Sequence, residues 1–504
     1  MIQDFDQFYR NLLFRKAVLP NDNPSLLRDF LDSVCRVEPK VNEILSGSSQ
    51  IVVDSGTDES TTIINAVTEI SRSTPALRPI LEEYSRKYGL ELAQEFIDDY
   101  RSCAEPKVLF VAAVPYFQLV RISIALRRRG IHTYLLNLNL SDTALTDLHD
   151  ASFDRHLTLP DNLLSLGAVL DAVEAPLIYL QVSMAEFDFP ISSFVLENKG
   201  PAKCVCEFYD VLSLYYEKEI LRRYFPDATD YHFHVEDLVF EKGDAFTCRF
   251  HPSAIEELRR NHGTTKEIVE FHPYPLSDFS TYTDEKESDR DGLIRLVYTG
   301  RITELNINGE FAMPEIRLGG YLLETFRRIT AQGLAVELFT DPHFNIESRE
   351  GFELYMEMAM MDPFFSVNSG YPPHELAREI NKFDFGLNIL GIDKSKLAIK
   401  ETQFMSVGTK IFTYLEAGIP VIVSREWEYI SEIVEENGLG MALLGSEIEQ
   451  LGQRIECFDY DQSVESIQKF NIDNSLQIHI EKLTTLFESL IPDWHAGTHA
   501  DRSV

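Results

Sequence analysis

The chain has 504 residues, 44% of them hydrophobic, and a formal net charge of −35. At roughly 150 residues per domain this length predicts about three domains, and the apolar share excludes global disorder. Such an acidic chain repels nucleic-acid phosphates and anionic lipid surfaces, which disfavours a nucleic-acid enzyme. No run approaches the roughly 18 apolar residues of a membrane span, and the first residues lack the pattern of a signal peptide. We therefore expect a cytoplasmic protein with no transmembrane segment.

Residues 1–104 are expected to form a helical extension. Its strongest amphipathic stretch is 76–103, where Leu77, Leu81 and Tyr84 recur at helical spacing. No residue pattern there indicates chemistry. The extension is a candidate surface for an acceptor, for a carrier protein or for a second copy of the chain in a homo-oligomer.

From residue 105 onward, short apolar runs alternate with amphipathic helical patterns, which is typical of a parallel sheet built from βαβ units. The predicted strands of this first set are 107–114, 131–138, 175–182, 202–210 and 266–275, with a strand-rich piece over 237–250. The predicted helices are 120–130, 211–225 and 252–263. Residues 105–283 are therefore predicted to form a Rossmann-like domain.

The charged stretch 284–292 contains no apolar residue and ends in glycine, which predicts a linker. The same alternation then restarts. The predicted strands are 293–300, 334–340, 384–390, 419–424 and 440–444, and the predicted helices are 317–333, 372–383, 408–418 and 426–438. Residues 293–470 are thus a second Rossmann-like domain, and 471–504 a C-terminal helix with a polar tail. We predict an α/β fold of two doubly wound domains, with ligands at the carboxyl ends of the strands.

The segment 408–424, GTKIFTYLEAGIPVIVS, is the most specific stretch of the chain. A helix that starts at Gly408, Thr409 and Lys410 presents free N–H groups, a hydroxyl and a cation to an anion. These residues are suited to a diphosphate. The alternative interpretation of these residues is a capped surface helix with a solvated lysine that binds no ligand.

The segment resembles the C-terminal-domain signature of GT-B glycosyltransferases, which use nucleotide-sugar donors. The matching positions are Lys410, Tyr414, Leu415, Ala417, Gly418, Pro420 and Val421. VYTGRITE resembles the entry to that domain, which implies that Arg301 meets the donor phosphates. The stretch 363–390 resembles the segment around the nucleoside pocket, which implies that the pocket is bordered by Asn368, Ser369, Gly370 and Tyr371. The resemblance also implies a metal-independent hexosyltransferase that needs no cofactor.

Some positions depart from the family pattern. Where retaining members carry two glutamates eight residues apart, this chain has Met405 and Thr413, and Glu416 is expected on another side of the helix. In the first domain, Asp210 ends a predicted strand and is our candidate for the base that deprotonates the acceptor hydroxyl. Capping the helix that starts at Val211 is the alternative for Asp210. His272 is the second candidate base, with an ordinary loop histidine as the alternative.

The cysteines show no CxxC spacing, and we expect no metal ion. Cys204 and Cys206 share one face of a predicted strand. We expect them to be buried, reduced thiols, and the alternative is a pair of metal ligands. His232 and His234 have no evident third ligand.

The leading hypothesis is a glycosyltransferase that moves a sugar from a nucleotide diphosphate to a hydroxyl of a glycan or protein acceptor. The alternatives are a degenerate GT-B scaffold that binds a nucleotide sugar or a partner protein without turnover, which the missing glutamates favour, and a nucleotide-sugar epimerase. Because the chain is so acidic, a dianionic donor requires a local region of positive potential. We expect this region to be formed by Arg301, Lys410 and the helix N-terminus.

Overall fold

The computed structural model describes residues 78–113, 115–138, 146–159, 163–182, 188–226, 229–300, 302, 322–340, 352–390, 397–492 and 494. Helix α5 (Arg78–Ser102) matches the last helix expected in the extension. The rest of the extension, residues 1–77, lies outside the described residues. Within the described ranges, no helix is both long and apolar enough to cross a membrane.

The first lobe is built on a parallel, seven-stranded sheet in the order β3-β2-β1-β4-β5-β6-β7. Its strands are β1 (Lys107–Ala112), β2 (His132–Asn137), β3 (Arg155–Thr158), β4 (Leu177–Val182), β5 (Lys203–Phe208), β6 (Ala245–Cys248) and β7 (Ile268–Glu270). After its first residue every position of β1 is buried, as expected of a strand covered on both faces. The order reverses between β1 and β4, so a ligand is expected at the carboxyl ends of these strands.

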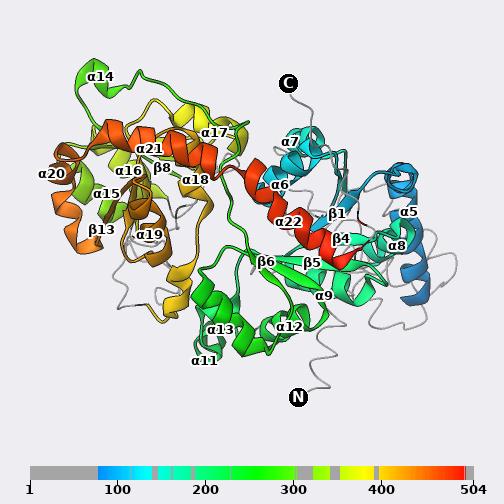
Figure 1. The fold of residues 1–504 in the computed structure, drawn as a ribbon. Coiled ribbons are helices and arrows are strands. Elements are labelled where there is room, and N and C mark those ends of the chain that lie inside the picture. The colour runs from blue at the N-terminus through cyan, green and yellow to red at the C-terminus, as the bar shows by residue number, and fades with distance from the viewer. Residues whose placement is uncertain are drawn as a thin grey trace, which may run out of the picture.

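Helices cover both faces of this sheet (Figure 1). Besides α5, the lobe contains α6 (Phe117–Arg128), α7 (Thr146–Ser152), α8 (Leu163–Val173), α9 (Asp188–Asn198), α10 (Leu212–Tyr215), α11 (Lys218–Tyr224), α12 (Thr229–Lys242) and α13 (Pro252–His262). Helices α5, α8, α9 and α12 pack on one face together with Cys204 and Cys206 of β5. Both cysteines are free and buried, which confirms the prediction of buried thiols.

The second lobe is built on a parallel, six-stranded sheet in the order β10-β9-β8-β11-β12-β13, which reverses between β8 and β11. Its strands are β8 (Arg295–Thr299), β9 (Ala335–Phe339), β10 (Phe365–Asn368), β11 (Phe385–Asn388), β12 (Val421–Ser424) and β13 (Gly440–Leu443). The helices are α15 (Leu322–Thr330), α16 (Glu353–Met361), α17 (Pro373–Ile380), α18 (Thr409–Glu416), α19 (Glu428–Glu436), α20 (Leu451–Glu456) and α21 (Tyr460–Asp473), with 3-10 turns over Glu401–Met405 and Gly445–Gln450. Helices α15, α16 and α20 share one core, and α17, α18, α19 and α21 share the other.

The chain crosses between the lobes twice (Figure 1). The first crossing leads from β7 to α14 (Ser288–Asp291), which lies inside the predicted linker and contacts the second lobe where the Ser288 hydroxyl donates to Asp384. The second crossing leads from α21 into the last helix, α22 (Leu476–Leu490), which matches the C-terminal helix predicted within 471–504. Helix α22 returns to the first lobe and packs its apolar side beside α6.

Several parts of the first lobe differ from the element prediction, and α7, α8 and α9 were not predicted at all. Residues 237–242 were expected in a strand-rich piece and belong to α12, because Tyr231, Val235 and Val239 recur every four residues and are all buried. The helix expected over 211–225 is two short helices, separated by the extended residue Tyr216. The short edge strand β3 was not predicted, since its four residues are mostly polar.

Candidate functional site

The start of α18 is the predicted anion site. Gly408 precedes the helix in an extended conformation, with no side chain capping the helix end. A Cβ built on Gly408 meets no atom of the described residues within 4 Å, so the space beside the helix end is open. The N–H groups of the first turn, which begins at Thr409, have no acceptor within the helix. They can therefore donate hydrogen bonds to an anion that sits in this space.

Lys410 lies across the carboxyl end of β8. Its ammonium donates a hydrogen bond to the Tyr298 hydroxyl and lies 3.8 Å from the centroid of the Tyr298 ring. The side chain passes so close to Gly300, whose φ is +99°, that a Cβ there would lie 3.1 Å from Lys410 Cε. Burial lowers the pKa of Lys410 to about 7. Among the described residues, no carboxylate forms an ion pair with this ammonium.

Tyr414, one turn further along α18, fixes the helix against the sheet. Its buried hydroxyl accepts a hydrogen bond from the Thr299 backbone N–H at 3.0 Å and donates to the Leu387 carbonyl at 3.0 Å. A Cβ on Gly386 would lie 2.2 Å from the Tyr414 ring, so β11 needs glycine at this position. The tyrosine thus links α18 to β8 and β11, the two strands at the reversal of the sheet order. It positions Lys410 at the point where Rossmann-like sheets bind ligands.

The remaining donor-side residues are placed in part. Arg301 lies outside the described residues. Asn368 ends β10, and its amide donates to Glu337 Oε2 at 3.0 Å and to Ser366 Oγ at 2.9 Å. Ser369, Gly370 and Tyr371 follow in the turn before α17, with Ser369 exposed and the other two partly exposed. The nucleoside role of these four residues stays a prediction.

Asp210 lies two residues after β5 and does not cap the helix that follows. That helix has Val211 as its N-cap and no side-chain cap. Instead Asp210 Oδ1 accepts hydrogen bonds from the Arg249 guanidinium and the Tyr215 hydroxyl, both at 3.1 Å. Arg249 also donates to the Val407 carbonyl at 3.0 Å. The Arg249 guanidinium therefore bridges Asp210 of the first lobe and Val407, the residue before Gly408, in the second. This contact places Asp210 at the interface between the lobes.

The segment before α18 packs directly on the first lobe. Phe250 and Ser406 form an antiparallel bridge, and the His251 N–H donates to the Met405 carbonyl at 2.8 Å. The side chain of Met405, which stands where the resemblance expects a glutamate, packs against the core of the first lobe. This position serves contact between the lobes rather than chemistry.

His272 is buried at the same interface but belongs to another cluster. Its Nε2 lies 2.6 Å from Glu270 Oε1 and 3.2 Å from the hydroxyl of Tyr429, a residue of α19. Burial alone would raise the pKa of Glu270, but hydrogen bonds from His272 and Tyr429 lower it to about 2. The structure therefore keeps His272 beside an ionised carboxylate and does not show it in contact with Lys410. The proposed roles of Asp210 and His272 as bases stay predictions.

The element prediction missed a buried ion pair. Arg121 of α6 and Glu416 of α18 form two parallel hydrogen bonds of 2.6 Å each, and both side chains are almost fully buried. Glu416 also accepts from the Leu276 N–H at 2.7 Å, and Arg121 donates to the Tyr274 carbonyl at 3.1 Å. The pair therefore joins one helix of each lobe to the crossing segment. No sequence signal connects two residues 295 positions apart.

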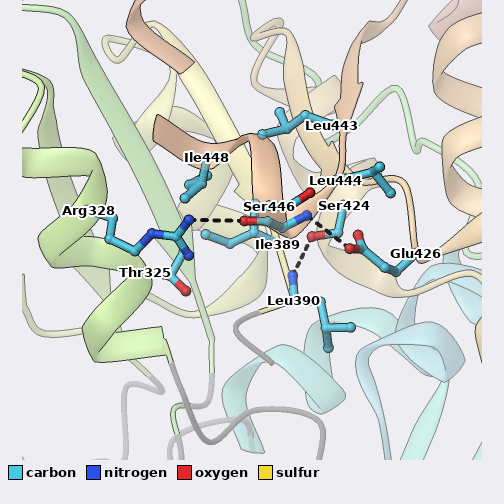
Figure 2. A pocket seen from close by; sticks show the side chains of 11 residues that line it. Thr325, Arg328, Ile389, Leu390, Ser424, Glu426, Leu443, Leu444, Ser446 and Ile448 are labelled. Carbon is cyan, nitrogen blue, oxygen red and sulfur yellow. Dashed lines mark hydrogen bonds between the residues drawn. The ribbon is translucent and has the colours of Figure 1, made fainter. Parts of the chain in front are cut away.

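A cavity of about 390 Å³ opens at the carboxyl ends of β11, β12 and β13. Arg328 and Glu426 lie on opposite sides of this cavity in Figure 2. The Arg328 guanidinium donates to the Gly445 carbonyl at 3.3 Å, and the Glu426 carboxylate accepts from the Gly445 N–H at 2.9 Å. Ser424 Oγ accepts from the Leu390 N–H at 2.6 Å. This cavity, lined by both polar and apolar side chains, lies at the same edge of the sheet as Lys410 and was not predicted.

Comparisons with known proteins agree with this architecture. Residues 345–484, which include α18, match the family model described as "Glucosyltransferase 3-like, C-terminal domain". A search of curated protein sequences found no match.

Solved structures with a similar fold include HepE from Anabaena in complex with UDP-glucose, at 12% identity, a TM-score of 0.52, and coverage of 76% of this chain and 99% of that chain. HepE in complex with UDP and glucose aligns at 14% identity with the same TM-score, over 76% of this chain and 100% of that chain. An α,α-trehalose-phosphate synthase from Burkholderia vietnamiensis aligns at 10% identity and a TM-score of 0.49, over 77% of this chain and 98% of that chain. At these identities the HepE structures establish the shared fold alone.

The predicted GT-B arrangement of two Rossmann-like domains is confirmed by the two parallel sheets and by the shared fold. The resemblance of the second domain to nucleotide-sugar glycosyltransferases is confirmed by the family match. No comparison favours the scaffold or the epimerase alternative.

Proposed function

We propose that this GT-B protein is a glycosyltransferase that moves a hexosyl group from a nucleoside diphosphate sugar to a hydroxyl of a glycan or protein acceptor. The observation that carries the proposal is the position of Lys410, an ammonium with no carboxylate partner in the described part of the chain, beside the open N-terminus of α18. The family match over residues 345–484 supports the same reaction class. The HepE complexes make UDP-glucose the first donor to test.

In the reaction, the bond between the anomeric carbon and the diphosphate oxygen breaks while a bond to the acceptor oxygen forms. Negative charge then develops on the departing nucleoside diphosphate. Lys410, the N–H groups at Gly408 and Thr409, and Arg301 stabilise that charge, and oriented donors and cations of this kind favour the transition state. This arrangement supplies the positive charge from the protein, so we propose a metal-independent enzyme without a cofactor.

The acceptor hydroxyl must lose a proton as its oxygen attacks. Asp210 is our candidate base, because it lies just after the carboxyl end of β5, at the interface between the lobes, and both of its hydrogen bonds use Oδ1. Arg249 fixes the carboxylate, which leaves Oδ2 for the proton. The acceptor then lies between Asp210 on the first lobe and the donor on the second. An acidic chain disfavours an acceptor held on an anionic membrane, which favours a soluble glycan or a protein.

The direct test is release of UDP from UDP-glucose, with and without a panel of glycan and protein acceptors, in the presence of EDTA. We expect turnover in the wild type and at least a hundredfold loss in Lys410→Ala and Arg301→Ala. Lys469→Ala removes an exposed lysine of α21 and should behave as the wild type.

Wild-type turnover in both Lys410→Ala and Arg301→Ala would refute the assignment. Donor binding without turnover on any acceptor would identify a scaffold, and conversion of the donor without an acceptor to an isomeric nucleotide sugar would identify an epimerase.

A further inference from the structure

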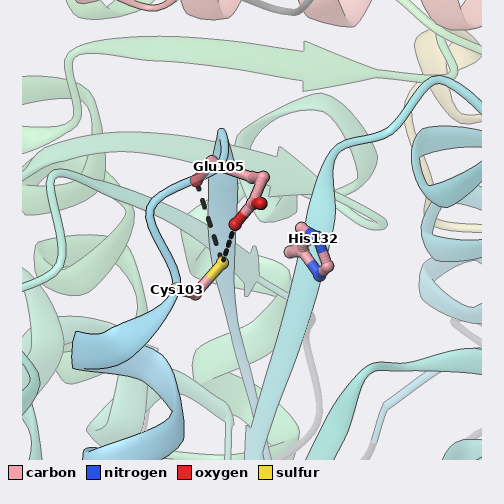
Figure 3. A group of neighbouring side chains, drawn as sticks. All are labelled: Cys103, Glu105 and His132. Atoms are coloured by element: carbon pink, nitrogen blue, oxygen red, sulfur yellow. Dashed lines mark hydrogen bonds between the residues drawn. The ribbon is translucent and has the colours of Figure 1, made fainter.

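Three side chains with different ligand chemistry meet at the amino-terminal edge of the first sheet. Cys103 and Glu105 lie in the segment that joins α5 to β1, and His132 is the first residue of β2. His132 pairs in register with Lys107, the first residue of β1, so the two strands begin side by side. Figure 3 shows the three side chains gathered at these strand starts. The predicted catalytic residues lie at the opposite, carboxyl edge of the sheets.

The spacing of the three groups suits a small divalent cation. One ligand atom from each residue lies within 4.8 Å of the other two. Cys103 Sγ is 3.6 Å from Glu105 Oε2. A tetrahedral zinc ion with bonds of about 2.3 Å to sulfur and about 2.0 Å to oxygen separates those two atoms by about 3.5 Å. The pair is therefore already at the distance that zinc requires, and a modest approach of the imidazole completes three ligands.

Neighbouring groups fix the ligand-bearing segments. The Lys107 ammonium donates to the carbonyls of Tyr100 at 2.5 Å and of Cys103 at 2.6 Å, which fixes the end of α5 against the start of β1. On the other side, Asp154 Oδ1 lies 3.4 Å from His132 Nδ1, and Asp154 Oδ2 accepts from the Thr133 N–H at 2.8 Å. A carboxylate beside a ligating histidine orients the ring and raises its basicity.

We propose that Cys103, Glu105 and His132 bind one Zn²⁺ ion that fastens the end of α5 to the start of the first sheet. The thiolate, imidazole and carboxylate are the donor set that zinc takes in proteins, and a thiolate disfavours magnesium and calcium. Glu105 is exposed and the other two residues are partly exposed, so water completes the fourth position. The role is structural, and the proposal stands whether or not the chain transfers a sugar.

The competing explanation is a plain hydrogen bond from the Cys103 thiol to Glu105. Zinc analysis of the reduced, full-length protein separates the two. After metal removal with a chelator and buffer exchange, titration against a chromophoric zinc indicator should show one tight equivalent. Cys103→Ser and His132→Ala should each weaken that equivalent at least tenfold, while Cys457→Ser, at an exposed free cysteine, should leave it unchanged.

Two further readouts guard against a folding artefact. Cobalt(II) added to the metal-free protein should produce a sulfur-to-metal charge-transfer band that Cys103→Ser lacks and Cys457→Ser retains. Zinc should raise the melting temperature of the wild type, as expected for a ligand of the native state, and not that of Cys103→Ser. Absence of a tight equivalent in the wild type overturns the proposal, and so does an equivalent that survives both Cys103→Ser and His132→Ala with unchanged affinity.

Discussion

At the scale of single residues, the site depends on a lysine that the fold leaves without an acidic partner in the described part of the chain. The sequence motif identified Lys410, but its neighbours Tyr298 and Gly300 come from another strand and were not predicted as contacts. They give the cation a half-buried place beside an aromatic ring, where burial lowers its pKa to about 7. If the proposed site binds an anion, that anion is expected to restore the charge on Lys410 that burial disfavours.

Replacing Lys410 by methionine should stabilise the ligand-free protein in a pH-dependent way. Below pH 7 the lysine is charged in both states, and burial then penalises the native form in full. Between about pH 7 and 10.5 the native state has lost the proton that the unfolded state still binds, so the penalty shrinks as pH rises. We expect Lys410→Met to gain about 1 to 3 kcal/mol of unfolding free energy at pH 6, and less at pH 9. Urea unfolding at both pH values measures this, with Lys469→Met as control. An equal gain at pH 6 and pH 9 would show that Lys410 is not buried as described.

At the scale of elements, most strands and helices follow from apolar patterning, because both sheets are parallel and buried on two faces. The runs at β1, β2, β4 and β5 in the first lobe were predicted within a few residues for this reason. Apolar patterning fails where a short segment fits both helical and strand periodicity. In α12, the apolar residues at its C-terminal end resemble a strand when the rest of the helix is not considered. Apolar patterning also fails for β3, an edge strand with little apolar signal.

The candidate site divides in the same way. Gly408, Thr409 and Lys410 could be predicted because they lie together on one helix start. The hydrogen-bond partners of three site residues could not be predicted, because only the tertiary fold brings them together. These pairs are Lys410 with Tyr298, Asp210 with Arg249, and Glu416 with Arg121.

Tyr414→Phe tests whether α18 is positioned by its tyrosine hydroxyl. The change keeps the ring against Gly386 and leaves the Thr299 N–H without its acceptor in a buried place. Such an unpaired group costs about 1 to 3 kcal/mol, so the midpoint of urea unfolding should fall accordingly. UDP affinity should fall as well, because Lys410 shares the helix. An unchanged midpoint together with unchanged UDP affinity would show that the hydroxyl does not position α18.

At the scale of the whole molecule, the lobes are joined by polar contacts as well as by chain crossings. The Arg121–Glu416 pair is inaccessible to solvent, and it contacts the crossing segment at Tyr274 and Leu276. A buried pair of this kind contributes little net stability but is costly to break singly, since the remaining charge is left unpaired. It therefore fixes the arrangement of α6 against α18 rather than adding to the overall stability.

A double-mutant cycle measures this coupling. We expect Glu416→Gln and Arg121→Met each to lower the free energy of unfolding by about 3 to 5 kcal/mol. The double variant should lose clearly less than the sum of the two, because neither charge then remains alone. Additive losses in urea unfolding would mean that the two side chains do not interact in solution.

The net charge of −35 means that a dianionic nucleotide sugar needs a local positive site to bind. The central claim is that Lys410 at the start of α18 provides this site. Calorimetric titration of UDP into the wild type and into Lys410→Met, at pH 7 in EDTA, tests that claim most directly. We predict binding to the wild type with uptake of part of a proton, seen as a dependence of the heat on the buffer's ionisation enthalpy, and at least tenfold weaker binding without that uptake in Lys410→Met. Equal affinity in the two proteins would contradict the account, because the diphosphate would then bind elsewhere.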